Sequence, residues 1–514
     1  MRQGMRGCLG YLGTLGTAIL AVVVLASGGL SGCVFYLNPL CDDQIRNGEE
    51  TDIDCGGTCG QKCSIGDSCS GTTDCDDSNC VRGTCTPKPC DNGQLDPGET
   101  DVDCGGATCR QCSGGRKCMI GSDCFNGTCL PDPDPASGRP NTCSSLTTVS
   151  FAPAVSYLAG AKPYALFSGD LNGDGRIDLV VANEISSSIS VFLNDGTGVF
   201  QRLAPFATGA YPTGGTLVDF NQDNILDVVT ADYHGNSVSV LLGVGAGGPP
   251  VKGTGALAPA VSYLTTAGGE TSNLAVGDLN RDNNLDVVAT NQAESSVSVF
   301  LGLDGGALAP GVTLPVGISG ASHPFSTAIG DFNGDGNDDV AIGDNTSGTI
   351  LVRLGNGDGT LQAEVGYPVG GDPGYVIITS DVDRDGKLDL VSANRSSDNI
   401  SVLQGRGDGT FRKAIASPAG AGSGPYSVAV ADFNQDGVPD VITANFMSSN
   451  ASVLLGIGNG HFEAPIDAGP TDAFCYGVAA GDFDGDTVPD FATANALGGN
   501  MMGGNMTVKL STSH

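Results

Sequence analysis

The stretch Asp170-Leu171-Asn172-Gly173-Asp174-Gly175-Arg176-Ile177-Asp178 decides the fold, because the chain repeats its pattern seven times. The six equivalents are spaced by 49 to 59 residues and begin at Asp219, Asp278, Asp331, Asp381, Asp432 and Asp482. Self-similarity with a period near 50 residues is typical of β-propellers and solenoids.

The sequence around each motif predicts strands only. In the sixth unit, apolar runs at 427–432, 440–445 and 451–455 are followed by a Gly-rich turn at 458–462 that opens a fourth run. Runs of four to six residues that are rich in β-branched side chains and bounded by Gly, Asn and Asp are too short for helices. Four strands per unit is the content of one propeller blade, and closing seven blades in a ring protects the sheet edges. Residues 144–514 are therefore predicted to form an all-β, seven-bladed β-propeller of four-stranded blades.

The two ends of this region indicate how the ring closes. The last unit stops after its third strand, at 506–510, and an unassigned strand at 147–158 precedes the first motif. Residues 151–157 of that strand are similar to 257–263, the fourth strand of the second unit. We expect the early strand to complete the seventh blade, whereas an open solenoid would need separate caps.

The repeated motif also carries a pattern of oxygen ligands. Side-chain oxygens at positions 1, 3, 5 and 9 and a backbone carbonyl at position 7 suit a hard cation that takes six to eight oxygens, such as calcium. The candidate ligands in the seven loops are Asp170, Asn172, Asp174, Arg176, Asp178; Asp219, Asn221, Asp223, Ile225, Asp227; Asp278, Asn280, Asp282, Asn284, Asp286; Asp331, Asn333, Asp335, Asn337, Asp339; Asp381, Asp383, Asp385, Lys387, Asp389; Asp432, Asn434, Asp436, Val438, Asp440; and Asp482, Asp484, Asp486, Val488, Asp490.

Position 12 separates these loops from EF-hands, which place a bidentate Glu there. No copy has a carboxylate at that position, which is occupied by Val181, Thr230, Ala289, Ile342, Ser392, Thr443 and Thr493. The combination instead resembles the FG-GAP or VCBS repeats of integrin α-subunit propellers and their bacterial relatives, over about 370 residues. The resemblance implies one calcium ion per blade, in the turn between the first two strands. The alternative is a set of Asx-rich turns that bind no metal.

The seven sites are not expected to be equal. Position 6 needs a left-handed backbone, which Gly175 adopts without strain and Asn224 tolerates. Thr487 is β-branched and should resist that conformation. We therefore predict up to seven calcium ions, with the seventh site the weakest despite its additional carboxylate, Asp484.

Composition limits the function. The 514 residues include 57 acidic and 23 basic ones, for a formal net charge of −34. Such a charge repels phosphate backbones and anionic lipid headgroups, which argues against nucleic-acid binding. Hydrophobic residues make up 40% of the chain, enough for a core.

The first residues read as a targeting segment. Arg2 and Arg6 precede an apolar stretch from about Leu9 to Ala26, as in a secretory signal. The stretch ends in 30–33, Leu-Ser-Gly-Cys, which resembles the lipobox of bacterial lipoproteins and implies cleavage before Cys33 and lipidation of that cysteine. Residues 1–32 would be the signal peptide and 33–40 a short tether, on a protein exported and lipid-anchored at the bacterial cell envelope. An ordinary signal or a single membrane span is the alternative.

Residues 41–143 form a predicted small disulfide-rich region made of two copies, 41–89 and 90–143, the second including a Pro-rich linker. Each copy has eight cysteines, in the order Cys41, Cys55, Cys59, Cys63, Cys69, Cys75, Cys80, Cys85 and Cys90, Cys104, Cys109, Cys112, Cys118, Cys124, Cys129, Cys143. So few apolar residues require covalent cross-links, and eight cysteines allow 105 pairings. A zinc site at 109–112 is disfavoured because no histidine lies in the region, and the acidic run 50–55 is more simply a solvated turn than a calcium site. The pattern resembles cysteine-rich repeats of bacterial surface proteins, which suggests a spacer.

The sequence does not indicate an enzyme. His234, His323, His461 and His514 are scattered, and we expect the first two to be solvated loop residues. Arg176, Lys387, Arg395 and Arg406 appear dispersed, whereas an enzyme would gather Lys, Arg, Tyr and His at the ring's centre. Cys475 is expected to be a buried strand residue, with a bond to Cys143 as the alternative.

Recognition is therefore the preferred hypothesis. A calcium-stabilised surface propeller would present its loops to an unknown protein or glycan partner, as the integrin resemblance implies. The insertion 243–255 and the loop at 501–502 are the candidate contact loops. The alternatives are a carbohydrate-active enzyme resembling a polysaccharide lyase and a purely structural surface component.

Overall fold

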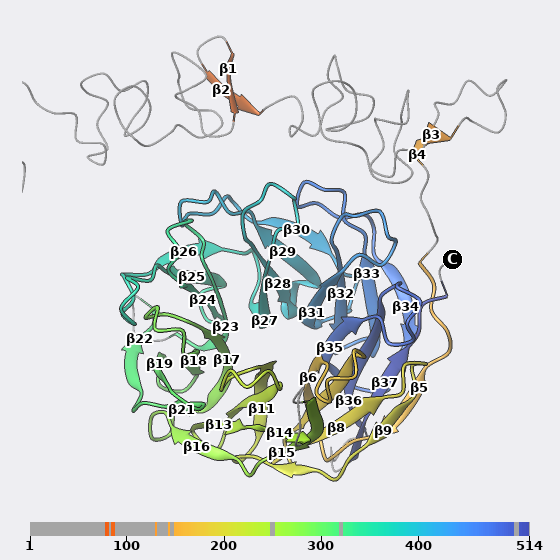
Figure 1. Ribbon diagram of the computed structural model, residues 1–514. Helices are drawn as coiled ribbons and strands as arrows, with labels where there is room; N and C mark the ends of the chain where they lie inside the picture. Colours follow the sequence, from red (N-terminus) through yellow and green to blue (C-terminus); the bar gives the residue numbers. More distant parts are fainter. Residues whose placement is uncertain are drawn as a thin grey trace, which may run out of the picture. The chain divides into compact units, whose positions relative to one another are not determined.

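The computed structural model describes residues 149–246, 252–317, 322–497 and 503–512, together with four short strands before them (Figure 1). Those strands form two antiparallel pairs, β1 (Ser78–Val81) with β2 (Thr84–Pro87) and β3 (Cys129–Leu130) with β4 (Thr142–Cys143). The predicted signal peptide and tether, and Cys33 with them, lie outside the described residues. Across the described part of the chain, no helix has the length and apolarity needed to cross a bilayer.

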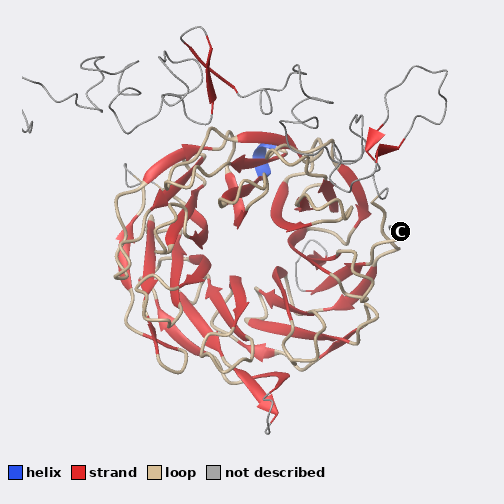
Figure 2. Cartoon of the chain, turned by 45° about the horizontal axis from the view of Figure 1, so that its top comes forward, coloured by secondary structure: helices blue, strands red, loops and turns tan. Residues whose placement is uncertain are grey.

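The region from residue 149 onward is all-β and closes into a ring of seven antiparallel sheets (Figures 1 and 2). Its one described helical element is the short turn η4 (Arg395–Ser397), drawn in blue in Figure 2. The prediction of a seven-bladed propeller is confirmed.

Blades 1 to 4 run from the channel outward as follows: β6 (Pro163–Gly169), β7 (Asp178–Asn183), β8 (Ser188–Asn194) and the short β9 (Phe200–Arg202) and β10 (Phe206–Ala207); β11 (Pro212–Val218), β12 (Asp227–Asp232), β13 (Ser237–Leu241) and β16 (Val261–Leu264); β17 (Thr271–Gly277), β18 (Asp286–Asn291), β19 (Ser296–Phe300) and β22 (Val312–Pro315); β23 (Pro324–Gly330), β24 (Asp339–Asp344), β25 (Thr349–Arg353) and β26 (Val365–Pro368). Blades 5 and 6 are β27 (Pro373–Ser380), β28 (Asp389–Asn394), β29 (Asn399–Leu403) and β30 (Ile415–Pro418); β31 (Pro425–Ala431), β32 (Asp440–Asn445), β33 (Asn450–Leu454) and β34 (Ile466–Pro470).

Blade 7 joins the two ends of the ring. It consists of β35 (Cys475–Gly481), β36 (Asp490–Leu497), β37 (Gly503–Lys509) and β5 (Val155–Leu158), which comes from before blade 1. Strand β5 pairs with β37 in the register Val155↔Val508, and Phe151 forms a further bridge to Ser511. The predicted closure by the early strand is confirmed.

The core lies between neighbouring blades. The second strand of each blade reads as a continuous apolar run, and every residue is buried in β7, β12, β18, β24, β28 and β32 because blades cover both faces of the strand. Phe192 of blade 1 shares one cluster with Phe483 and Met506 of blade 7. Each such buried side chain contributes about 1.5–3 kcal/mol, so the blades hold one another together.

Two features lie outside the repeat. The insertion in blade 2 forms a hairpin of β14 (Gly243–Ala246) and β15 (Lys252–Leu257), and blade 3 carries the short pair β20 (Gly302–Leu303) and β21 (Ala307–Leu308). Gly253 of the hairpin packs against the backbone of Leu171, which leaves no room for a Cβ. The insertion therefore lies against the first Asp-rich loop. The loop at 501–502 lies outside the described residues.

The first strands of the blades surround a channel of 480 Å³. They run from one end of the channel to the other, so the residues before them and the loops after them lie at opposite ends.

Candidate metal loops and the opposite rim of the channel

The seven Asp-rich loops, called the Asp loops below, connect the first and second strands of each blade. They are 170–177, 219–226, 278–285, 331–338, 381–388, 432–439 and 482–489, and each is followed directly by a second strand. The predicted ligands therefore lie where the sequence placed them, all at one end of the inner strands.

Each Asp loop is folded by its own carboxylates. In the first loop, Asp170 accepts hydrogen bonds from the N–H groups of Asp174 (3.1 Å) and Gly175 (2.8 Å), and Asp174 accepts one from Arg176 (3.0 Å). The bond from position 6 to position 1 and the bond from position 7 to position 5 recur in all seven loops. The carboxylates at positions 1 and 5 are consequently held on the same turn of the loop by backbone N–H groups.

Position 6 has a left-handed backbone in every loop. Its φ angle is 86° at Gly175, 66° at Asn224 and 74° at Thr487. Thr487 thus adopts the conformation that it was expected to resist. Among the described loops, the seventh alone lacks a bond from position 5 to the first Asp. It keeps only the bond from position 5 to position 3, from the Asp486 N–H to Asp484, which all seven loops share.

Position 9 has a structural role that the sequence analysis did not identify. Asp178 is fully buried; one carboxylate oxygen accepts the N–H of Leu171 (3.0 Å) and the other accepts the N–H of Asn194 (2.8 Å). The same two bonds occur at Asp227, Asp286, Asp339, Asp389, Asp440 and Asp490. The ninth residue therefore fastens the Asp loop to the turn after the third strand of its blade.

Burial raises the pKa of these ninth-position carboxyls. The pKa of Asp178 rises to about 6 and that of Asp440 to about 8, in both cases mainly by desolvation. Desolvation first and the charge of Asp383 second raise the pKa of Asp389 to about 7. A neighbouring cation would relieve both effects, because it favours the ionised form.

The donor set fits a hard cation. Carboxylate oxygens of Asp381, Asp383 and Asp385 lie within 4.8 Å of one another, and so do those of Asp482, Asp484 and Asp490. The remaining five loops have Asn at position 3, which supplies an oxygen without a charge. Oxygen-only groups of this kind match calcium rather than zinc or copper.

In two of the Asp loops, a basic side chain of the loop forms an ion pair with one of the loop's own carboxylates. Arg176 lies 3.5 Å from Asp174 and Lys387 lies 3.3 Å from Asp385, both as partly exposed ion pairs at position 7. Exposed pairs of this type contribute at most about 1 kcal/mol, so they neutralise the loops only weakly. Position 7 offers its backbone carbonyl, so these side chains remain outside the ligand set.

Neighbouring Asp loops are linked through position 4, a contact that the sequence did not reveal. The Arg281 guanidinium donates to the Gly336 carbonyl (3.1 Å), and the Gln435 amide donates to the Thr487 carbonyl (3.0 Å). Gln222 makes the corresponding bond to Asn283. Each acceptor is position 6 of the next loop, so these bonds link the second loop to the third, the third to the fourth and the sixth to the seventh.

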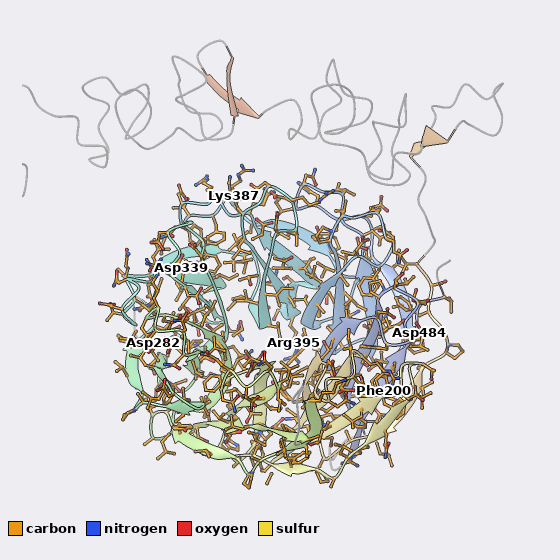
Figure 3. The ribbon with its side chains drawn as sticks, viewed as in Figure 1. Phe200, Asp282, Asp339, Lys387, Arg395 and Asp484 are labelled. Carbon is orange, nitrogen blue, oxygen red and sulfur yellow. The ribbon has the colours of Figure 1, made fainter. Side chains whose placement is uncertain are left out.

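The opposite end of the channel carries aromatic and basic residues. Tyr164 stacks on Tyr476 with ring centroids 4.7 Å apart, and Tyr426 meets Tyr476 edge-on at 5.0 Å. Lys162 lies 5.5 Å from the Tyr164 ring, and the Arg395 guanidinium lies 4.7 Å from the Phe446 ring. Figure 3 shows Arg395 near the middle of the ring and the labelled Asp282 and Asp339 toward its outside.

This gathering corrects part of the sequence interpretation. Arg176 and Lys387 do lie apart from Arg395, as expected, because they belong to Asp loops. Lys162 and three tyrosines nevertheless converge at this end of the channel, and no local motif marks them because they come from blades 1, 6 and 7.

Two histidines and the cysteine of the propeller region lie outside the Asp loops. His234 and His323 are exposed, as expected; the first contacts the rings of Tyr211 and Tyr233, and the second contacts the Thr346 hydroxyl. Cys475 is a free, fully buried thiol, and desolvation raises its pKa to about 12. It is therefore an inert core residue.

The sequence model described as FG-GAP-like repeat matches the chain in six overlapping windows, 170–230, 219–289, 278–342, 331–392, 381–443 and 432–493. No curated protein sequence matches the chain.

Several solved structures are similar to the chain at low identity. The chain is similar to BBS1N crystallised with ARL6DN (11% identity, 70% of this chain and 96% of that one, TM-score 0.46). It is also similar to an Agrocybe aegerita lectin that recognises non-reducing terminal N-acetylglucosamine (20%, 63% and 81%, 0.41) and to virginiamycin B lyase from Staphylococcus aureus (12%, 69% and 99%, 0.45). At these identities and scores, the likenesses carry no information about ligand or activity.

Proposed function

The chain belongs to the FG-GAP-like repeat family over residues 170–493, and from that premise we propose that it is a calcium-stabilised recognition propeller, lipid-anchored outside the cytoplasm, that binds a protein or glycan partner. The observation that carries the proposal is the sevenfold Asp loop at one end of a closed ring. The repeated end would stabilise the ring, which leaves the other end free for recognition.

The candidate calcium ligands are the side chains at positions 1, 3, 5 and 9 and the carbonyl at position 7 of each Asp loop. Bound calcium would supply positive charge to carboxylates that otherwise repel one another. The chain's own bonds already orient positions 1 and 5, as Asp170 and Asp174 do through backbone N–H groups. Because these side chains are already held in place, the loop loses less conformational entropy when an ion binds.

Recognition is supported by the contrast between the two ends of the channel. The Asp loops repeat one hydrogen-bond pattern, whereas the opposite end carries a different side chain from each blade, for example Glu184, Arg395 and Phe446. Varied loops on a rigid scaffold are the usual place for partner binding. The blade-2 insertion is a weaker candidate contact, because it packs against the first Asp loop.

Removal of calcium tests the stabilising role. We expect the melting temperature of the full chain to rise on adding calcium and to fall in EGTA, with up to seven ions bound in calorimetric titration. The double variant Asp381→Asn/Asp383→Asn should lose one ion, while Asp195→Asn, an exposed acid outside the Asp loops, should lose none. An unchanged melting temperature in EGTA would overturn the calcium part of the proposal.

Anchoring and partner binding need separate measurements. Labelled fatty acid should be incorporated into the chain in bacteria and not into the Cys33→Ala variant. Binding of the Cys33→Ala variant, which would lack the lipid anchor, to intact bacterial and host cells should be saturable and should fall in EGTA. Absence of any saturable binding would leave a purely structural component as the function.

A second candidate, a carbohydrate-active enzyme, is favoured by one observation. The hydroxyl groups of Tyr164 and Tyr426 are hydrogen-bonded to each other close to Lys162 and Tyr476, and a tyrosine beside a cation can serve as a general base. Incubation with uronate-containing polysaccharides, followed at the absorbance of unsaturated products, decides between the candidates. Product formation that Tyr426→Phe abolishes would establish the enzyme.

A further inference from the structure

Two residues of every blade lie side by side at the channel end opposite the Asp loops. One residue immediately precedes the inner strand, and the other immediately follows the second strand or, in blade 7, lies near its end. In six blades the N–H of the second residue donates to the carbonyl of the first, as from Glu184 to Lys162 (2.9 Å) and from Tyr233 to Tyr211 (2.8 Å). We call these fourteen positions the channel rim: Lys162, Glu184, Tyr211, Tyr233, Glu270, Gln292, His323, Asn345, Asp372, Arg395, Gly424, Phe446, Phe474 and Ala496.

The channel rim varies where its surroundings repeat. The residue just before each second rim position is always Asn or Asp, as at Asn183, Asp232 and Asn291. The second rim position itself is Glu, Tyr, Gln, Asn, Arg, Phe and Ala in blades 1 to 7. Because the surrounding residues repeat while the rim residues differ, folding does not require a particular side chain at the rim positions.

Polar atoms of the channel rim are buried without partners. Within the described chain, the Gln292 Oε1, Asn345 Oδ1 and Arg395 Nε atoms are inaccessible to solvent and form no hydrogen bond. A buried polar group without a partner costs about 1–3 kcal/mol, and such groups are uncommon in folded proteins. The three side chains share one repeat position and are themselves half-buried, so a group from outside the chain that seated there would supply the missing partners.

The charges of the channel rim nearly cancel, with the two cations Lys162 and Arg395 against the three carboxylates of Glu184, Glu270 and Asp372. Lys162 forms an ion pair with Glu184, Glu270 accepts the Tyr233 hydroxyl at 2.7 Å, and Asp372 accepts the hydroxyl of Ser396. Arg395 has no carboxylate partner among the described residues. A ligand for this surface is therefore polar and close to neutral.

Aromatic side chains complete the surface. Phe446 and Phe474 are half-buried with ring centroids 5.4 Å apart, and the Tyr164, Tyr426 and Tyr476 side chains beside them line the channel. The channel itself is lined by the inner strands rather than by the rim side chains, and its volume of 480 Å³ lies within the range of small-molecule sites, about 300–1,000 Å³.

We propose that the channel rim binds a saccharide. The C–H face of a sugar ring packs against aromatic rings, while its hydroxyl groups satisfy the amides of Gln292 and Asn345 and the Arg395 guanidinium. A nucleic acid or an anionic membrane is disfavoured by the net charge of −34. The inference rests on the proposed recognition function and names its partner class.

Binding of the full chain to an immobilised panel of bacterial and host oligosaccharides tests the proposal. The test variant is Gln292→Ala/Asn345→Ala/Arg395→Ala, which removes no hydrogen bond of the described chain but does remove the contact of Arg395 with the Phe446 ring, so thermal unfolding first checks that the variant is folded. The matched control is Gln201→Ala/Gln362→Ala/Lys413→Ala, which removes two amides and one cation from exposed outer positions. We expect the wild type and the control to bind the same saccharides, and the test variant to bind them at least tenfold more weakly, about 1.4 kcal/mol.

The outcomes separate the inference from the proposed function. Saturable cell binding without binding to any saccharide would overturn the inference, assign a protein partner and leave the recognition function in place. Equal binding by the wild type and the test variant would also overturn it. Absence of both cell and saccharide binding would overturn both. The single variant Arg395→Lys keeps the charge but not the planar stacking, and it should bind more weakly than the wild type.

Discussion

Position 6 of the seventh Asp loop is where residue type and backbone conformation conflict. Thr487 has a φ angle of 74°, a region that costs a β-branched residue about 1–3 kcal/mol. Thr487→Gly should therefore raise the free energy of unfolding by about 1 kcal/mol and tighten the seventh calcium site. Urea denaturation with calcium and with EGTA measures the first effect, and calorimetric titration measures the second.

The matched control makes the opposite change at the same position. Gly386 has a φ angle of 82°, and a Cβ placed there meets no atom within 4 Å, so Gly386→Thr isolates the backbone cost. It should destabilise the chain by a similar amount. A loss of stability in Thr487→Gly would show that the threonine side chain contributes more through its contacts than its backbone conformation costs.

Asp232 offers a test of a buried charge away from the Asp loops. It is fully buried at the end of β12, where it accepts the hydroxyls of Ser237 (3.1 Å) and Ser239 (2.6 Å), and desolvation raises its pKa from 3.8 to about 6. Between about pH 4 and 6, the Asp232 carboxyl is therefore protonated in the folded chain and ionised in the unfolded chain. The contribution of Asp232 to stability is full below about pH 4 and is lost as the pH rises through 6.

The repeat itself supplies the substitution. The equivalent Asn291 donates to Ser296 (3.2 Å) and Ser298 (2.9 Å), so Asp232→Asn should keep the network without a buried charge. We expect the variant to melt higher than the wild type at pH 7.5, with the difference shrinking toward pH 4.5. A difference independent of pH would mean that Asp232 does not titrate in this range.

At the scale of single elements, two short hairpins constrain the cysteine pairing. Strand register sets Cys80 opposite Cys85 and Cys129 opposite Cys143, and these are the seventh and eighth cysteines of the two repeats. Directly opposed cysteines in antiparallel strands have a Cα separation suited to a disulfide. We predict these two bonds, which would leave 15 pairings for the other six cysteines of each copy.

Peptide mapping under non-reducing conditions measures the pairing directly. The exported protein should yield one fragment that joins residues 80 and 85 and another that joins 129 and 143. Recovery of Cys143 joined to Cys475 would contradict the prediction and the assignment of Cys475 as a free thiol.

Strand β5 and the residues before it hold the ring closed. The Phe151 ring contacts the fully buried rings of Phe491 (4.8 Å) and Phe433 (6.1 Å). Because Phe151 is half-buried, Phe151→Ala should cost about 2 kcal/mol, less than the 3–5 kcal/mol of a fully buried phenylalanine. It should also increase hydrogen exchange in β37, whose outer edge β5 covers.

Phe411 is the matched control, since it forms the equivalent bridge within a continuous blade. It is buried against Phe332 and Tyr367. Phe411→Ala should cost at least as much stability as Phe151→Ala without a selective increase of exchange in β37. Equal exchange patterns in the two variants would argue against a closing role for the early strand.

On the scale of the whole molecule, the sequence predicted the features that a local repeated pattern marks and missed contacts between residues far apart in the chain. The Asp loops, the seven blades and the closing strand all leave a periodic trace, and the position of Phe151 followed from its likeness to Leu257. The convergence of Lys162 with Tyr476 joins residues more than 300 positions apart and has no local pattern. The second bond of each ninth-position Asp, to an N–H group about 16 residues away, was hidden for the same reason.

The net charge of the chain depends on all seven Asp loops together. Seven divalent ions would add fourteen positive charges and change the formal charge from −34 to −20. In EGTA, raising NaCl from 0.01 to 0.1 M shortens the Debye length from about 30 to about 10 Å, so the melting temperature should rise as repulsion between Asp loops is screened. With saturating calcium the same change of salt should raise it less, since the carboxylates are already neutralised. Thermal unfolding at matched ionic strengths measures both slopes, with Asp381→Asn/Asp383→Asn as a variant that should weaken the dependence in EGTA. Equal slopes with and without calcium would contradict electrostatic coupling between the ions and the stability of the ring.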